Sequence, residues 1–150
     1  TPMPALNDVA VVRGTVVRVI YVRVMVDGET LTTYKADGVL ASTPTGSTGY
    51  SLSAGGPIIY PTLQAILITP LVPHLTMTTP IIVPPTATIE LEVNTDHEAI
   101  LSIDGQIDIL LHNKDTVRVQ KSPHIARFWR AHPPGHFYRT LTKRLQLNNL

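Results

Sequence analysis

The middle of the chain carries no charged side chain. Of all features of the sequence, this one restricts the possible folds most. From Gly38 to Ile89 there is no Asp, Glu, Lys or Arg, while eight prolines interrupt the same stretch. Surface loops are seldom so uncharged, because charged residues are almost never fully buried and belong to the surface. One interpretation is a set of short core strands joined by proline turns. The other is that another domain, a ligand or a second subunit covers part of the stretch, since exposed apolar surface usually has a partner.

Patterns typical of β-strands lie on both sides of this stretch. From Val9 to Tyr34 most residues are Val, Ile, Tyr, Thr or Met, which fit a pleated sheet. Asp27-Gly28 and Asp104-Gly105 are typical hairpin turns. The predicted strands are 9–13, 16–26, 30–35, 39–41, 88–93, 99–103, 106–111 and 117–120. Residues 88–93 alternate strictly, with carboxylates on one face, as a half-buried strand requires. The sequence therefore predicts a mainly β, antiparallel, sandwich-like domain.

Only the end of the chain has a longer helical pattern. Phe137, Leu141 and Leu145 recur every four residues with basic side chains between them, an amphipathic period near 3.6. Pro133-Pro134-Gly135 is expected to start this C-terminal helix.

Composition narrows the class of protein. A chain of 150 residues with 43% hydrophobic content can form one domain with a core. The net charge of +1 argues against a nucleic-acid partner, and the absence of cysteine excludes disulfides and thiolate metal sites. No apolar stretch approaches the roughly 18 to 20 residues of a membrane helix, and residues 1–7 do not resemble a targeting segment. A cytoplasmic location is compatible with these features. Because the chain lacks an initiator Met, we expect it to be a fragment of a longer protein.

A glycine-rich segment is the candidate for chemistry. Five of the nine glycines fall between positions 38 and 56, and residues 42–57 read STPTGSTGYSLSAGGP. After the strand at 39–41, Ser47 is a suitable N-cap for a short helix over 48–54, which Gly55-Gly56 would end. Free backbone N–H groups and hydroxyls at such a turn suit an anionic or polyhydroxyl ligand, and the Tyr50 ring can stack on a base. The alternative is a purely structural turn, since the segment matches neither the P-loop nor the dinucleotide-fold fingerprint.

The same segment, preceded by Asp37-Gly38, resembles the signature of NAD kinases. Further stretches resemble that family in the same order along the chain. They are Ala5-Leu6-Asn7-Asp8, Pro73-His74 followed by residues 80–84, residues 102–106, and the tail at 137–145. The resemblance covers essentially all 150 residues. It implies the antiparallel β-sandwich-like C-terminal domain of the NAD kinase/diacylglycerol kinase-like fold, with a short helix after the glycine-rich turn and a C-terminal helix.

The resemblance also implies a reaction. In that family ATP or polyphosphate gives its terminal phosphoryl group to the 2′-hydroxyl of the adenosine ribose of NAD, giving NADP, normally with Mg²⁺. The family's Gly-Gly-Asp-Gly-Thr loop binds the donor and supplies the aspartate usually proposed as the base. It lies upstream of the Asn-Glu/Asp motif and is absent from this sequence. Residues 1–150 would therefore be a single NAD-binding β domain, inactive alone, that works with an N-terminal α/β domain, and its catalytic residues are unknown.

Site residues follow from the resemblance, residue by residue. Those expected to bind NAD are Asn7, Asp8, Asp37, Thr45, Thr48, Gly49, Tyr50 and Ser53, with Lys35 and His74 as possible contacts in the ligand region. Carboxylate and amide groups suit ribose hydroxyls and an exocyclic amine, because each can make paired hydrogen bonds. Without the resemblance, Asn7-Asp8 would be an ordinary turn before a strand. The family usually has Ala where Gly49 stands and Arg where Thr79 stands; the second difference removes a cation.

Other residues and partners have weaker signals. His132 and His136 are separated by Pro133-Pro134-Gly135, which prevents a helix, so they need not share a face as metal ligands would, and no metal ligand is assigned. Phe128 and Trp129 are interpreted as core or interdomain anchors. The resemblance implies a homodimer or homotetramer. Two alternatives stay open: a non-catalytic module that binds NAD or assembles subunits, and a lipid-kinase C-terminal domain, against which the string at 43–53 argues.

Overall fold

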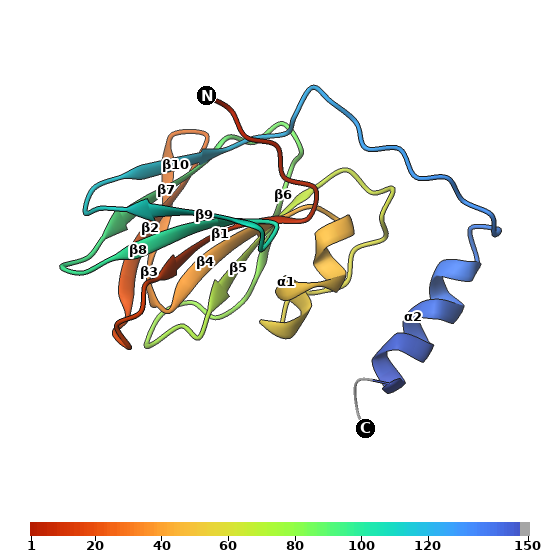
Figure 1. Ribbon diagram of the computed structural model, residues 1–150, viewed down its shortest axis with the longest axis horizontal. Helices are drawn as coiled ribbons and strands as arrows, with labels where there is room; N and C mark the ends of the chain where they lie inside the picture. The colour runs from red at the N-terminus through yellow and green to blue at the C-terminus, as the bar shows by residue number, and fades with distance from the viewer. Residues whose placement is uncertain (148–150) are drawn as a thin grey trace.

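The computed structural model describes residues 1–147, with the side chains of all residues up to Leu141 and of Lys143. Ten strands of this part of the chain form two antiparallel sheets that pack face to face (Figure 1). The six-stranded sheet has the order β6-β5-β4-β1-β8-β9 and the four-stranded sheet the order β10-β7-β2-β3. The bounds are β1 Asp8–Arg13, β2 Ile20–Val26, β3 Glu29–Ala36, β4 Gly38–Ser42, β5 Ile66–Leu71, β6 Ile81–Val83, β7 Ile89–Asn94, β8 Ala99–Ile103, β9 Ile107–Leu111 and β10 Thr116–Val119. The predicted mainly β sandwich is confirmed.

The core lies between the two sheets. Successive side chains of a strand point to opposite faces, so every second residue of each strand enters the core. In the six-stranded sheet these residues include Val11, Val39 and Leu101, and they meet Val22 and Leu91 of the four-stranded sheet. Full burial of such a side chain stabilises the fold by about 1.5–3 kcal/mol. The residues between them point away from the core and remain available for other contacts.

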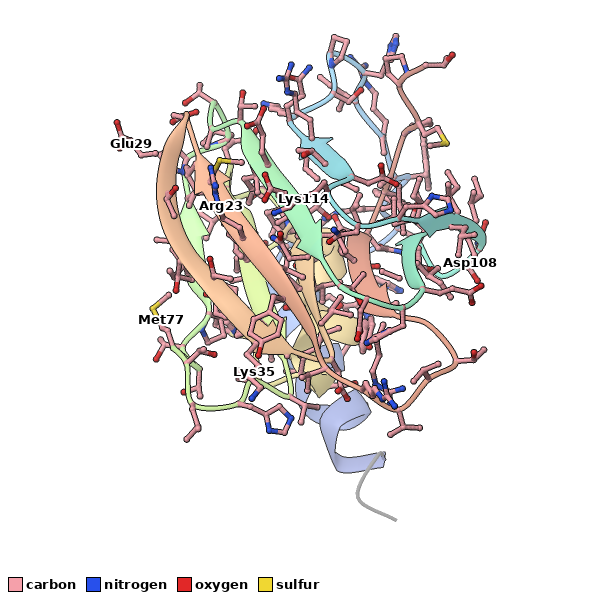
Figure 2. All side chains as sticks on the ribbon, turned by 90° about the vertical axis from the view of Figure 1, so that its left-hand side faces the viewer. Arg23, Glu29, Lys35, Met77, Asp108 and Lys114 are labelled. Atoms are coloured by element: carbon pink, nitrogen blue, oxygen red, sulfur yellow. The ribbon has the colours of Figure 1, made fainter. Side chains whose placement is uncertain are left out.

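The outer faces of the two sheets differ in chemistry. The four-stranded sheet presents charged side chains to solvent, among them Arg23 and, beside the sheet, Lys114 (Figure 2). The six-stranded sheet instead presents Ala10, Leu40 and Leu71, which form a second small cluster. Ala54, directly after the short helix α1 (Tyr50–Ser53), packs on that cluster. The outer face of the six-stranded sheet is therefore partly covered by the glycine-rich segment.

Both predicted hairpin turns are present. Asp27 and Gly28 have φ angles of 52° and 85°, and Asp104 and Gly105 have 52° and 64°. Two successive residues in the left-handed region are what a type I′ turn needs, and Asp-Gly is a favoured pair there. The loop between the paired strand ends has two residues in the first hairpin and three in the second. The two turns join β2 to β3 and β8 to β9.

One predicted strand was too long. Residues 16–26 were expected as one strand, but β2 begins only at Ile20. Ile20 pairs with Ala36, the last residue of β3, and the next strand begins at Gly38. Residues before Ile20 therefore have no partner on β3, and the exposed Val17 lies in a loop despite its β-branched side chain.

The uncharged stretch contains the strands β5 and β6, whose boundaries were not predicted. All six residues of β5 are buried, which agrees with the interpretation of short core strands. The short edge strand β6 pairs only with residues 66–68 of β5, so Pro70 lies beyond it. Pro70 pairs with Val39 of β4 on one side only, and on the side beyond β6 a missing N–H breaks no ladder hydrogen bond.

The prediction of the helix after the glycine-rich turn was wrong in detail. Instead of one helix over 48–54, there is a 3-10 helix η1 (Thr45–Thr48) followed by α1. Ser47 is not an N-cap. Its buried hydroxyl donates to the Pro44 carbonyl at 2.7 Å and accepts the Ile59 N–H at 2.9 Å. Ser47 thus ties the segment to the chain that follows it.

The C-terminal helix α2 (His136–Leu147) begins directly after Pro133-Pro134-Gly135, as predicted. Figure 1 shows α2 set apart from the sheets at the end of a long extended segment. The Phe137 ring meets Tyr60 edge-on, with ring centroids 4.9 Å apart. The side chain of Leu145, part of the predicted apolar pattern, lies outside the described residues. No helix in the described part of the chain is long and apolar enough to cross a membrane.

The structure excludes one of the two interpretations of Phe128 and Trp129, and it brings His132 and His136 closer together than the sequence required. Phe128 and Trp129 are 57% and 97% exposed, so neither is a core residue of this chain. His132 and His136 do come together, with stacked rings whose centroids are 4.1 Å apart. The turn at Pro133-Pro134-Gly135 folds the chain back before α2 starts, and this brings the two rings side by side without a shared helix.

Candidate functional site

A cavity of about 670 Å³ opens on the outer face of the six-stranded sheet. On one side it is bounded by η1 and the start of α1, and on another by the β8–β9 hairpin. Its lining residues are Asn7, Asp8, Ala10, Val12, Arg13, Asp37, Thr45, Gly46, Thr48, Gly49, Tyr50, Leu71, Ile100, Ser102, Asp104, Gly105 and Asp108. The volume is in the range of pockets that bind small molecules and cofactors.

The floor of the cavity is apolar because of strand alternation. Val12 of β1 pairs directly with Ile100 of β8, and Ala10 with Ser102. These residues lie on the face opposite to the core residues Val11 and Leu101 of the same strands. Polar side chains stand around this floor. The arrangement suits a ligand with a flat apolar part and hydrogen-bonding edges.

Asn7 and Asp8 lie where the chain enters β1. Asp8 is only 9% exposed, and its burial raises the pKa of its carboxyl group, with the negative charge of Asp104 adding to the effect. Asp104 accepts three backbone N–H bonds, from Leu6 at 2.7 Å, Asn7 at 2.7 Å and Asp8 at 2.9 Å. Burial alone would raise the pKa of Asp104, but these three bonds lower it below its usual value. The pKa values of the two neighbouring carboxyl groups are thus shifted in opposite directions.

The glycine-rich segment is fixed to the backbone of residues 6–7. The Thr43 N–H donates to the Asn7 carbonyl at 2.9 Å, and the Thr43 hydroxyl donates to the Leu6 carbonyl at 2.7 Å. The same hydroxyl accepts the Gly46 N–H at 3.0 Å. A Cβ atom at Gly46 would stand 2.0 Å from the Asn7 carbonyl oxygen. Only glycine therefore allows the turn to approach Asn7 this closely.

A charged pair lies at the other side of the cavity. Arg13 Nε is 3.2 Å from Asp37 Oδ1, and both side chains are about one-third exposed or less. The backbone adds to this contact, because the Arg13 N–H donates to the Asp37 carbonyl at 2.8 Å. Partial burial and the charges of Asp37 and Asp8 raise the pKa of Tyr50, while Arg13 acts in the opposite direction. The Tyr50 ring thus lies at the cavity in a mostly negative surrounding.

The structure brings most of the predicted site residues together. Seven of the eight expected NAD contacts line the cavity, namely Asn7, Asp8, Asp37, Thr45, Thr48, Gly49 and Tyr50. Ser53 is exposed on α1 and, in the described structure, is outside the lining. Lys35 and His74 are also outside it; they are joined by a bond from the His74 N–H to the Lys35 carbonyl at 2.8 Å. In Figure 2 Lys35 lies well away from Asp108 of the cavity wall.

Sequence reasoning missed one wall of the cavity. Arg13, Ser102 and Asp108 were not proposed as site residues. Asp104 was interpreted as part of a hairpin turn and of the stretch 102–106 that resembles the family, but it was not proposed as a site residue either. The alternation of residues 99–103 shows that Ile100 and Ser102 share a face. It does not show that this face meets the glycine-rich segment, because that depends on how β8 pairs with β1.

The cavity carboxylates do not form a metal centre. The described residues contain no group of three or more His, Asp or Glu side chains that could hold a metal ion. Asp104 is engaged by three amides and Asp37 by Arg13. Mg²⁺ in proteins is usually bound through only one or two carboxylates plus substrate phosphates. These residues therefore do not fit a dedicated Mg²⁺ site.

Comparison with curated proteins shows what this chain resembles. It is 46% identical over 144 residues to the NAD kinase of Dehalococcoides mccartyi (strain CBDB1), covering 96% of the chain and 51% of the relative. It is 40% identical over 142 residues to the NAD kinase of Chloroflexus aggregans, with coverage of 95% and 51%. The chain thus spans about half the length of the curated relatives it matches.

Two solved structures share the fold. The crystal structure of an NAD kinase from Archaeoglobus fulgidus in complex with ATP matches with a TM-score of 0.83 and 29% identity, over 94% of this chain and 56% of that one. The yeast NADH kinase complexed with NADH matches with a TM-score of 0.66 and 37% identity, over 77% and 34%. A family model described as the ATP-NAD kinase C-terminal domain matches residues 6–131. The sheets, the cavity and these matches lead to one conclusion: the chain belongs to the family of ATP-NAD kinase C-terminal domains.

Proposed function

We propose that this chain is the acceptor-binding part of an NAD kinase. In the proposed reaction, the 2′-hydroxyl oxygen of the adenosine ribose of NAD forms a bond to the terminal phosphorus of ATP or polyphosphate. The bond from that phosphorus to its bridging oxygen breaks, so ADP or a polyphosphate shortened by one unit leaves. The hydroxyl proton passes to the base that we propose comes from the N-terminal domain, and NADP is the product. The observation that carries the proposal is the single cavity in which seven residues of the predicted NAD site meet.

Different residues of the cavity can contact the different groups of the dinucleotide. Asn7 and Asp8 can hydrogen-bond the ribose hydroxyls and the adenine amine, and the Tyr50 ring can stack on a base. The apolar floor around Val12 and Ile100 can take flat, weakly polar surface. Asp37, held by Arg13, would face the nicotinamide end. Such positioning of the acceptor is the main task of a phosphoryl-transfer site.

The remaining parts of the enzyme are proposed to come from outside this chain. Residues 1–150 would be one NAD-binding β domain, and an N-terminal α/β domain would supply the donor-binding loop and the base. We further propose a homodimer or homotetramer and a cytoplasmic location. Mg²⁺, where it acts, would arrive with the donor phosphates, since the described residues contain no group of three or more His, Asp or Glu side chains that could hold it. The relatives solved with ATP and with NADH support this assignment of donor and acceptor classes.

Turnover by the full-length protein tests the proposal. NADP formation from NAD and ATP, or from NAD and polyphosphate, is expected and can be followed with an NADP-specific dehydrogenase. The rival function is a module that binds NAD or assembles subunits without catalysis. Calorimetry with NAD separates the two, since binding without NADP formation by the full-length protein would support the rival. A protein that phosphorylates diacylglycerol instead would belong to the lipid-kinase alternative.

Tyr50 should contribute directly to NAD affinity. Tyr50→Ala in the full-length protein is expected to weaken NAD binding by about 1–3 kcal/mol, the range for a base stacked on an aromatic ring. Calorimetric titration with NAD measures the effect. Tyr21→Ala is a matched control, because Tyr21 is 44% exposed on β2 and Tyr50 is 49% exposed. Equal affinity of the Tyr50→Ala protein and the wild type would remove Tyr50 from the site.

A further inference from the structure

Residues 6–8 are held through their backbone from two sides. On the N–H side, one carboxylate oxygen of Asp104 accepts from Asn7 and Asp8, and the other accepts from Leu6. On the carbonyl side, Thr43 bonds both Leu6 and Asn7. This leaves the Asn7 and Asp8 side chains, which both line the cavity, without a role in holding their own segment.

Asp104 is itself held firmly. It occupies the left-handed region at φ 52° in the β8–β9 turn, and its own N–H donates to the Asp8 carbonyl at 2.9 Å. Three of the roughly four acceptor positions of its carboxylate are filled by backbone amides. Hydrogen bonds to an ionised acceptor are about twice as strong as neutral ones. Through these bonds the β8–β9 turn holds the start of β1 in place.

We propose that Asp104 is a positioning residue of the acceptor site, which fixes the backbone of residues 6–8 so that Asn7 and Asp8 meet the dinucleotide in one geometry. The inference rests on the proposed function, because it assigns Asn7 and Asp8 to NAD. Asp104 acts through these two residues and not on the reacting atoms. A displacement of about 1 Å in such a contact can cost on the order of 100-fold in rate, so rigid support matters.

Asp104→Asn tests the role with little change in shape. The amide keeps one acceptor oxygen but replaces the other by an NH₂ group, which only donates. Whichever way the amide turns, at least one backbone N–H of residues 6–8 then faces a donor. The charge that strengthens all three bonds is lost as well.

Asp27→Asn is the matched control. Asp27 has the same φ of 52° in the other Asp-Gly turn. Its carboxylate accepts the Thr88 N–H at 2.8 Å, and its own N–H donates to the Thr88 carbonyl at 2.9 Å. The two aspartates thus make the same kind of contact, but Asp27 does so away from the cavity. Figure 2 shows Glu29, two residues further on, on the opposite side of the molecule from Asp108.

The experiment compares KM for NAD, KM for ATP and melting temperature of the full-length wild type with those of the two variants. Asp104→Asn is expected to raise KM for NAD about tenfold while KM for ATP stays within about twofold. Hydrogen exchange at the amides of residues 6–8 should accelerate at least about tenfold. Both variants should lower the melting temperature, Asp104→Asn more than Asp27→Asn because Asp104 accepts three backbone N–H bonds and Asp27 one, but Asp27→Asn should leave KM for NAD unchanged.

Each result decides the question. If both variants lose only melting temperature and keep the KM for NAD of the wild type, Asp104 has a structural role alone and the inference is wrong. If Asp104→Asn does not fold, Asp104→Glu retains the charge and the acceptors on a longer side chain. In that variant a raised KM for NAD with unchanged KM for ATP supports the inference, and an unchanged KM for NAD overturns it. A wild type that neither binds nor phosphorylates NAD refutes the proposed function instead.

Discussion

Gly46→Ala is expected to lower the free energy of unfolding by about 3 kcal/mol or more and to reduce NADP formation at least about 100-fold. The added Cβ would stand 2.0 Å from the carbonyl oxygen of Asn7 and 2.5 Å from its carbonyl carbon. Both are backbone atoms, so no side-chain rotation can relieve the clash. Either the glycine-rich turn or the start of β1 must move, and both line the cavity. Urea unfolding and initial rates on the full-length protein measure the two effects.

Gly49→Ala is the control for this prediction. A Cβ at Gly49 would meet only the Gly46 carbonyl oxygen, at 3.5 Å, which is an ordinary van der Waals contact. The family usually has alanine at this position. The free energy of unfolding of Gly49→Ala should therefore stay within about 1 kcal/mol of the wild type. A Gly46→Ala protein as stable as Gly49→Ala would show that the turn tolerates a side chain at both positions.

The second large effect is expected for the double variant Asn7→Ala/Asp8→Ala. The intact enzyme should lose at least about 100-fold in kcat/KM for NAD, because two hydrogen-bonding groups, an amide and a carboxyl group, leave the acceptor site. The fold should survive, since the segment is held by backbone bonds to Asp104 and Thr43. Steady-state kinetics with NAD as the varied substrate measures the loss. Wild-type kcat/KM would remove both residues from the site.

The same variant has a predicted pH signature in stability. The pKa of Asp8 is raised in the folded protein, chiefly by burial. Below its unfolded pKa the group is protonated in both states and contributes nothing. As pH rises through the raised folded pKa, the carboxylate ionises where its charge is disfavoured, and the wild type loses stability. The difference in free energy of unfolding should therefore shift in favour of the variant as pH rises from below 3.8, the ordinary pKa of an aspartate, through the raised folded pKa. A shift in the opposite direction would contradict the raised pKa.

The parts of the fold that local sequence determines were predicted well. Asp27-Gly28 and Asp104-Gly105 indicated their hairpins because two left-handed residues in a row demand such pairs. The strand β5 was not located, since all of its residues are buried and its pattern shows no alternation. The strand β2 is shorter than predicted because its partner β3 ends at Ala36, opposite Ile20. No local sequence pattern shows where a partner strand ends.

In the candidate site, too, the residues in local motifs were predicted, and the residues defined by long-range contacts were not. The glycine-rich segment and Asn7-Asp8 were found by resemblance, and the structure places both at one cavity. Asp104 was missed as a site residue because its contacts join positions 96 to 98 residues apart. Ser47 was misinterpreted for the same reason, since its partner Ile59 follows α1 and is not in the turn. Contacts of this kind depend on the register of strands and on the path of loops.

The alternation of β1 and β8 has a consequence for how this family can diversify. Val11 and Leu101 belong to the core between the sheets, while their neighbours Ala10, Val12 and Ile100 line the cavity. A substitution at Ile100 can therefore change the size or polarity of the cavity surface without replacing a residue of the core between the sheets, so the pocket and the main core can vary separately.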